Sequence, residues 1–142
     1  MAVSLSPPPR RMRRRLRARI ALVAVEAFVA VGAVYGSVML ITDAWRLDPA
    51  MLRHLPFDTW VLPGIALAAL IAVPNVVAGV LVARGHPRAR IVSMLAGGIL
   101  VGWIVVQIVL IQQYFFLQPV MGVCGLLTIG LAYRLPTGAA SS

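Results

Sequence analysis

The sequence has little charge, and most of that charge has one sign. Only four of the 142 residues are acidic, whereas thirteen are basic, and every basic residue is arginine because lysine is absent. Charged residues make up 12% of the chain and hydrophobic residues 61%, whereas roughly a quarter of a soluble domain is charged. This composition argues against a soluble domain and favours a membrane protein with room for one domain.

The residue types that carry most enzyme and metal chemistry are also scarce. Cys124 is the only cysteine, so the chain has no pair for an internal disulfide and no thiolate cluster for a metal. The two histidines, His54 and His86, lie in different loops, and no metal-ligand spacing or nucleophile–base pair accompanies them. We therefore expect no enzyme activity, no catalytic residue, no cofactor and no bound metal.

Long apolar runs are what the sequence does have. A helix needs about 20 apolar residues to cross the hydrocarbon core of a bilayer, and four runs reach or approach that length. The predicted fold is an all-α membrane protein, a four-helix transmembrane bundle over residues 20–135. Its expected spans are residues 20–42, 63–83, 91–112 and 117–135. The proline- and arginine-rich residues 1–19 and the tail 136–142 are expected to be disordered, because they have little apolar surface to bury.

Arginine lies mainly on one side of the predicted bundle. Eleven of the thirteen fall on the side of the two termini, and only Arg46 and Arg53 fall on the other. Because cytoplasmic loops carry such an excess of arginine, both termini are expected in the cytoplasm, and no nucleic-acid partner is needed to explain the charge. Seven arginines precede the first span and are expected to contact anionic lipid headgroups of the bilayer: Arg10, Arg11, Arg13, Arg14, Arg15, Arg17 and Arg19.

Three of the four acidic residues, Asp43, Asp48 and Asp58, lie in the predicted outer loop between the first two spans. Asp48 followed by Pro49 is typical of a helix start and predicts a short interfacial helix there. We expect Asp58 to cap the turn into the second span, and Asp43 to cap or to pair with a nearby arginine. The alternative is a metal or acid–base site formed by these aspartates with His54, which no ligand spacing supports.

Polar side chains at membrane depth are expensive and are therefore candidates for function. Glu26 is the only acidic residue in a predicted span. It lies about 9 Å from the cytoplasmic edge, at 1.5 Å per residue. Asn75 and Thr128 fall at a similar depth on other spans, so the three are predicted to form an intramembrane polar cluster. Tyr35 and Gln107 are predicted to form a second polar level nearer the outer side. Interhelical hydrogen bonding explains both levels, and proton, ion or ligand handling by Glu26 stays the open alternative.

Several short motifs, in their order along the chain, resemble a widespread group of small bacterial proteins. They are Gly32-x3-Gly36, Asp48-Pro49, Pro56-Phe57, Pro63-Gly64, Trp103-x3-Gln107 and Leu117-Gln118-Pro119. Over about residues 28–130 the chain looks like a member of this uncharacterised family of four-span integral membrane proteins. Glycine often follows the Asp-Pro pair in that family, whereas Ala50 stands here, which leaves the local turn open. The resemblance implies a multi-pass protein of the bacterial inner (cell) membrane and supplies no activity.

These features together predict a non-catalytic membrane protein: a scaffold, an accessory subunit or a lipid-contacting bundle. The alternative is a small transporter or channel component with Glu26 and Asn75 in a polar path. A water-accessible cavity around Glu26 favours transport, whereas close packing between helices favours the scaffold. Small residues spaced for close helix contact leave a homo-oligomer and a membrane partner protein open: Gly32 with Gly36, and Gly98 with Gly102.

Overall fold

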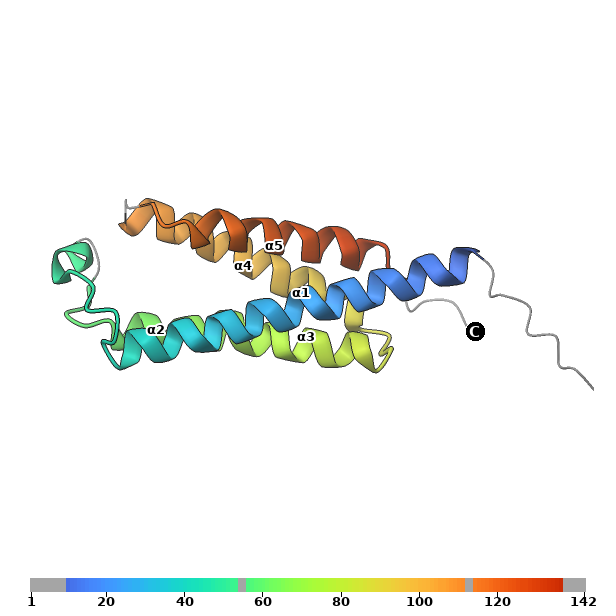
Figure 1. Ribbon diagram of the computed structural model, residues 1–142, viewed down its shortest axis with the longest axis horizontal. Helices are drawn as coiled ribbons and strands as arrows, with labels where there is room; N and C mark the ends of the chain where they lie inside the picture. The colour runs from blue at the N-terminus through green and yellow to red at the C-terminus, as the bar shows by residue number, and fades with distance from the viewer. Residues whose placement is uncertain (1–9, 54–55, 112–113, 137–142) are drawn as a thin grey trace, which may run out of the picture.

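A computed structural model describes residues 10–53, 56–111 and 114–136, and every regular element in these ranges is helical. The elements are α1 (Arg10–Ile41), η1 (Pro49–Leu52), α2 (Val61–Leu67), η2 (Ala68–Ala72), α3 (Val73–Ala83), α4 (Ala89–Ile111) and α5 (Leu117–Tyr133) (Figure 1). Because α2, η2 and α3 follow one another without a break, they form one helical rod. The predicted all-α class is confirmed.

Three helical segments are long and apolar enough to cross a membrane: Arg10–Ile41, Val61–Ala83 and Ala89–Leu110. The remaining apolar helix, α5, has 17 residues and is shorter than these. The last three helical segments end within two residues of the predicted boundaries. Hydropathy located them well because apolar runs of helical length, bounded here by proline and arginine, are strong signals.

The first helix begins earlier than the sequence predicted. α1 starts at Arg10, so the expectation of a disordered tail over residues 1–19 is corrected for residues 10–19. This part of α1 extends beyond the other helices (Figure 1). Arginine, leucine, methionine and alanine favour helix, and lengthening an existing helix needs no new nucleus. Residues 1–9 and 137–142 lie outside the described ranges.

Pro74 accounts for the π-helical turn η2 in the middle of the rod formed by α2, η2 and α3. Proline lacks an N–H, and its ring clashes with the carbonyl four residues before it, so a regular α-helix is interrupted there. The Val73 N–H donates to the Ala68 carbonyl, five residues earlier, and this bond gives the wider turn. The side-chain amide of Asn75 donates to the Ile71 carbonyl at 2.8 Å, one turn earlier in the same rod.

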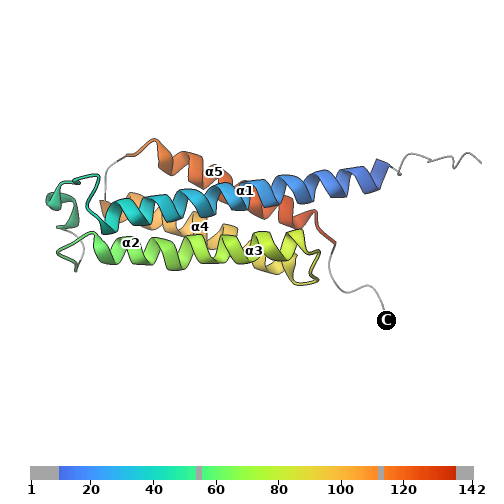
Figure 2. The ribbon, with the colours of Figure 1, turned by 60° about the horizontal axis from the view of Figure 1, so that its bottom comes forward.

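The long helices pack in a ring, in which α1 and α4 each contact both α3 and α5 (Figure 2). Two apolar clusters lie in the interior, one toward each end. The cluster nearer the loop between α1 and α2 includes Val29, Ala33, Ile71, Leu100 and Met121. The cluster nearer the other end includes Leu22, Val82, Ala89, Ala132 and Leu135.

Glycine allows the closest approach of α4 to α5. A Cβ atom on Gly97 would lie 2.8 Å from the Gly125 carbonyl oxygen, and a Cβ on Gly125 would lie 2.8 Å from Val101 Cγ2. By contrast, a Cβ on Gly98 or Gly102 would meet nothing within 4 Å. The Gly98–Gly102 pair therefore makes no close contact with another helix among the described residues, because each residue step turns the helix by about 100°.

Candidate functional site

Among the polar side chains that are buried in the described residues, four are almost completely inaccessible, one from each long helical segment. They are Glu26 on α1, Asn75 on α3, Ser93 on α4 and Thr128 on α5, and each is at most 1% exposed. Glu26 lies one turn from both Leu22 and Val29 along α1, and these two residues belong to different apolar clusters. The polar layer formed by the four side chains therefore separates the two clusters.

Glu26 contacts two neighbouring helices, α3 and α4, in this polar layer. A Cβ on Gly79, one turn beyond Asn75, would lie 3.6 Å from Glu26 Oε2, so Glu26 packs against α3. The Ser93 hydroxyl faces the Glu26 carboxylate from α4, although neither group reaches hydrogen-bonding geometry. The Thr128 hydroxyl donates to a backbone carbonyl one turn earlier on α5, at 2.9 Å. The three residues predicted to cluster are thus buried at this level, and Ser93 is a fourth member that the sequence reasoning missed.

Glu26 is packed between helices. Both of its carboxylate oxygens are buried without a hydrogen-bond partner, and so are Asn75 Oδ1 and Ser93 Oγ. Arg19 lies on the same helix, nearer the end that is expected to be cytoplasmic. Its Nη2 donates no hydrogen bond to Glu26 and instead donates to the Val82 carbonyl at 3.0 Å, at the end of α3. Arg19 is one of the seven arginines expected to contact lipid headgroups, and this hydrogen bond joins α1 to the end of α3.

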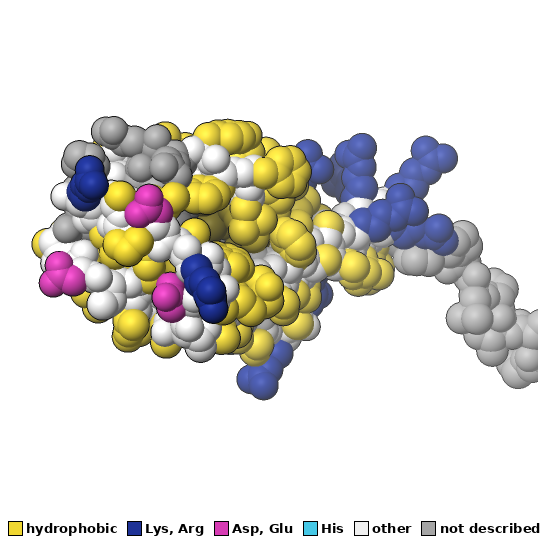
Figure 3. All heavy atoms as spheres, turned by 60° about the vertical axis from the view of Figure 1, so that its left-hand side comes forward, with side chains coloured by type: hydrophobic (Ala, Val, Ile, Leu, Met, Phe, Trp, Pro, Cys, Tyr) yellow, Lys and Arg dark blue, Asp and Glu magenta, His cyan; other side chains and the backbone are white. Residues whose placement is uncertain are grey.

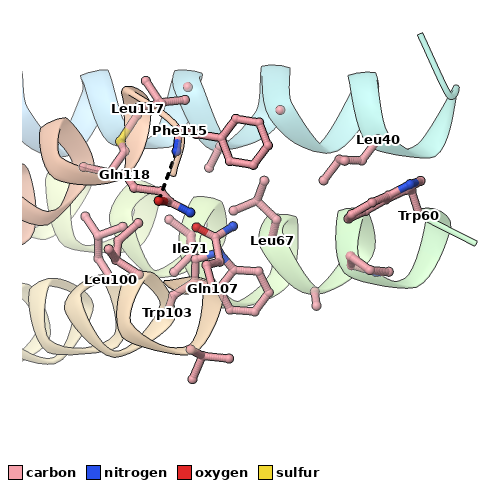
Figure 4. Close-up of a pocket in the computed structure, with 18 of the residues that line it drawn as sticks. Leu40, Trp60, Leu67, Ile71, Leu100, Trp103, Gln107, Phe115, Leu117 and Gln118 are labelled. Carbon is pink, nitrogen blue, oxygen red and sulfur yellow. Dashed lines mark hydrogen bonds between the residues drawn. The ribbon is translucent and has the colours of Figure 1, made fainter. Parts of the chain in front are cut away.

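The second predicted polar level does not form. Tyr35 is 57% exposed, and its ring packs edge-to-face on Trp45 with the ring centroids 6.2 Å apart. Gln107 instead lines a cavity inside the molecule, where its side chain points toward Gln118 (Figure 4). The position of a residue along a span gives its depth, but it does not give the side of the helix on which the residue lies.

This cavity is large and apolar, and it lies at the end of the molecule that carries the loop between α1 and α2. Its volume is about 830 Å³, within the range of roughly 300–1,000 Å³ for small-molecule sites. The pair α1 and α2 diverges from the pair α4 and α5 toward this end (Figure 1). Hydrophobic side chains from all four helices line the space between them, among them Leu40, Leu67, Ile71, Leu100 and Leu110.

A few uncharged polar groups interrupt the apolar lining. Gln118 is buried, and its Oε1 accepts a hydrogen bond from the Phe115 N–H at 3.3 Å (Figure 4). Trp60 and Trp103 also line the cavity, and the Nε1 atom of each indole is buried without a partner. No charged residue is among the described residues that line the cavity. The site therefore offers apolar surface with a small number of neutral donors and acceptors.

One of the three predicted aspartate caps has the expected hydrogen bond. Asp48 Oδ1 accepts from the Ala50 N–H at 2.8 Å, at the start of η1. Asp43 has φ 51° and follows the carboxyl end of α1, which offers free carbonyls and no free N–H to cap. Asp58 is not the N-cap of α2; Trp60 holds that position and makes no side-chain cap bond. The predictions for Asp43 and Asp58 as caps are corrected accordingly.

The alternative metal site in this loop has no assembled ligand set in the part of the chain that the structure describes. Within those residues no group of three or more histidine, cysteine, aspartate or glutamate side chains could hold an ion. His54, which that alternative needs, lies outside the described residues.

Comparisons of this chain with protein-family models, with curated proteins and with solved structures find no match. The resemblance to a family of small bacterial membrane proteins stays a prediction.

Proposed function

We propose that the chain is a four-span integral membrane protein with both termini in the cytoplasm, and that it acts as a non-catalytic, lipid-contacting bundle in a bacterial cell membrane. The observation that carries this proposal is the separation of charge between the two ends of an apolar molecule. Figure 3 shows acidic side chains at the near end and a group of arginines on the helix that extends from the other end.

The sides of the molecule between these ends are apolar and exposed. Large hydrophobic side chains that are more than half exposed occur on several helices, including Phe28, Val31, Leu95, Val109 and Leu126. Monomeric soluble proteins rarely expose a continuous apolar surface of this kind, whereas a bilayer core is an apolar solvent for it. The 17 residues of α5 span about 26 Å at 1.5 Å per residue, and a small local thinning of the bilayer would accommodate that length.

Cysteine labelling tests the orientation. Asp58→Cys and His86→Cys are introduced separately into a Cys124→Ser background, since both positions are exposed loop residues. A membrane-impermeant maleimide should label Asp58→Cys in intact spheroplasts and should label His86→Cys only after the membrane is permeabilised. The reverse pattern, or equal labelling of both sites in intact spheroplasts, would contradict the proposed topology.

The surroundings of Glu26 favour a non-catalytic role over transport. Glu26 is fully buried, and neither Glu26 nor Asn75 lines the large cavity. The layer instead places one buried polar side chain from each of α1, α3, α4 and α5 in the interior, as expected for polar groups that fix how membrane helices pack.

Glu26→Gln should therefore leave the protein stable and should change no activity. Glutamine keeps the shape of the side chain, removes its charge, and supplies N–H donors to the unpartnered Asn75 Oδ1 and Ser93 Oγ. Its unfolding midpoint in detergent should equal or exceed that of the wild type, while Glu26→Ala should lower it by leaving a cavity. Proton flux across proteoliposomes gives the second readout. A flux that the wild type shows and Glu26→Gln lacks would overturn the non-catalytic proposal and support the transporter.

We also propose that the bundle associates in the membrane, with a second copy of itself or with a partner protein. Gly98 and Gly102 leave an open strip on the outer face of α4, of the kind that lets another helix approach closely.

A further inference from the structure

We propose that the cavity between the two diverging helix pairs binds the hydrocarbon chain of an uncharged lipid whose ester or ketone oxygens accept hydrogen bonds from the cavity wall. This inference rests on the proposed membrane residence and orientation, which place the cavity in the outer half of the bilayer. Three observations select this ligand: the apolar lining, the absence of charge among its described residues, and the unpartnered indole donors.

The apolar lining excludes a water-filled path. The wall is aliphatic and aromatic over most of its area, and genuinely apolar cavities stay dry or take up apolar molecules. In a bilayer the apolar molecule present in excess is the lipid chain itself. A site of this kind is therefore filled by hydrocarbon whenever it is open to the membrane.

The size of the cavity argues against a second protein segment as the occupant. A helix about 10 Å across would fill about 830 Å³ within about two turns, which is far less than a membrane span. A lipid chain is thinner and flexible, so it can follow the space between the diverging helices.

The polar groups define which lipid the cavity favours. Trp103 and Gln107, one turn apart on α4, lie close to Gln118 of α5 on one wall (Figure 4). Trp60, which is 9% exposed, adds a second buried indole N–H without a partner. The two indoles and the Gln107 amide can donate to oxygen atoms, and no arginine or histidine among the described lining residues would balance a phosphate or carboxylate. A charged headgroup inside the cavity would be buried without compensation, so the favoured headgroup is neutral.

Tryptophan quenching by brominated lipids tests the proposal directly, since all three tryptophans of the chain line the cavity. The probe is a dibrominated monoacylglycerol titrated into the full-length protein in non-brominated detergent. Its charged counterpart is a dibrominated lysophosphatidylglycerol with the same chain. We expect saturable quenching by the neutral probe at a concentration at least about tenfold lower than that needed for the charged one.

Two kinds of variant locate the binding. Ala66→Phe fills the cavity from α2, and the exposed Ala69→Phe, one turn on and outside the lining, is its matched control. Ala66→Phe should weaken binding by at least about tenfold, whereas Ala69→Phe should not change it. Gln107→Leu should weaken the ester probe by about threefold to thirtyfold, the range for a hydrogen bond in a membrane, and leave a brominated alkane unaffected. If Ala66→Phe does not fold, Val106→Phe obstructs the same cavity from α4.

Three results would overturn the inference. The first is quenching that rises linearly and equally in the wild type and the obstructed variants, which would mean only general contact with lipid. The second is tighter binding of the charged probe. The third is a dimer that Ala66→Phe dissociates, which would make a second copy the occupant. The topology labels are read in the same variants. Correct labelling without saturable quenching overturns the cavity ligand alone, whereas reversed labelling overturns the proposed function.

Discussion

Replacing Gly97 with alanine should destabilise the protein, whereas the same replacement at its neighbour Gly98 should not. The new Cβ at position 97 would lie 2.8 Å from the Gly125 carbonyl oxygen, 2.9 Å from Ile129 Cγ1 and 3.2 Å from Thr128 Cβ. The closest of these contacts is to backbone, so a rotamer change cannot relieve it and α4 must move away from α5. Overpacking of this kind costs about 1–3 kcal/mol, and leucine in place of alanine should prevent the two helices from docking.

Gly98 is a matched control because it lies on the same helix with open space around it. Alanine favours helix over glycine by about 1 kcal/mol in soluble hosts, so Gly98→Ala should be neutral or stabilising. Gly97→Ala gains the same propensity and should still lose stability, so the two changes should have opposite or clearly different signs.

Thermal unfolding in mild detergent measures this difference. The half-buried Cys124 provides the readout, since a maleimide dye reacts with it as the helices separate. The unfolding midpoint should fall for Gly97→Ala, fall further for Gly97→Leu, and hold or rise for Gly98→Ala. Equal midpoints for the two alanine variants would show that α4 and α5 do not approach through Gly97.

The pair of glycines also shows what could be predicted from the sequence. The spans could be located because hydropathy needs only composition along the chain. The packing face of α4 could not, because residues toward lipid and residues toward the interior are both apolar, and the helical periodicity of a soluble helix is absent. The sequence therefore could not show that α4 contacts α5 through Gly97 and not through the small-residue motif Gly98–Gly102, which begins one residue later.

The same limit separates the polar layer from the second polar level. Glu26, Asn75 and Thr128 are each at most 1% exposed, as expected for polar groups that avoid lipid, while their meeting at one membrane depth stays a prediction. The count of residues along each span would not have added Ser93, which lies only two residues from the predicted inner end of its helix at residue 91. It gave the wrong answer for Tyr35, because a phenol tolerates the membrane interface and needs no interior partner.

The cavity could not have been predicted from any motif. It depends on the divergence of the helix pairs and on side chains that no local pattern relates, such as Trp60, Trp103 and Gln118. The helical start of α1 at Arg10 was missed for a different reason: consecutive arginines read as a solvated tail, although arginine is itself a good helix former.

Arginines on α1 are expected to have two roles: those on the helical extension bind anionic lipid, and Arg19 joins α1 to α3. Five exposed arginines lie on the first turns of α1, beyond the other helices, and should gather anionic lipid at the face proposed to be cytoplasmic: Arg10, Arg11, Arg13, Arg14 and Arg15. At about 1 kcal/mol for each arginine near the surface, replacing all five with glutamine should reduce the preference for phosphatidylglycerol over phosphatidylcholine by at least about tenfold. Six arginines remain on that side against two on the other, so the labelling pattern that reports orientation should not change.

Arg19→Gln should give the converse result. This side chain donates to the Val82 carbonyl at 3.0 Å and to the Ala83 carbonyl at 3.4 Å, so its loss should lower the unfolding midpoint while the lipid preference stays near that of the wild type. Brominated phosphatidylglycerol in mixed vesicles measures the preference, and the Cys124 assay measures the unfolding. If the variant with five arginines replaced by glutamine kept its preference for anionic lipid, the extension of α1 would not be the part of the chain that binds this lipid. If the orientation inverted, the remaining six arginines would be insufficient to set the topology, and the charge argument on which the four-span proposal depends would fail with it.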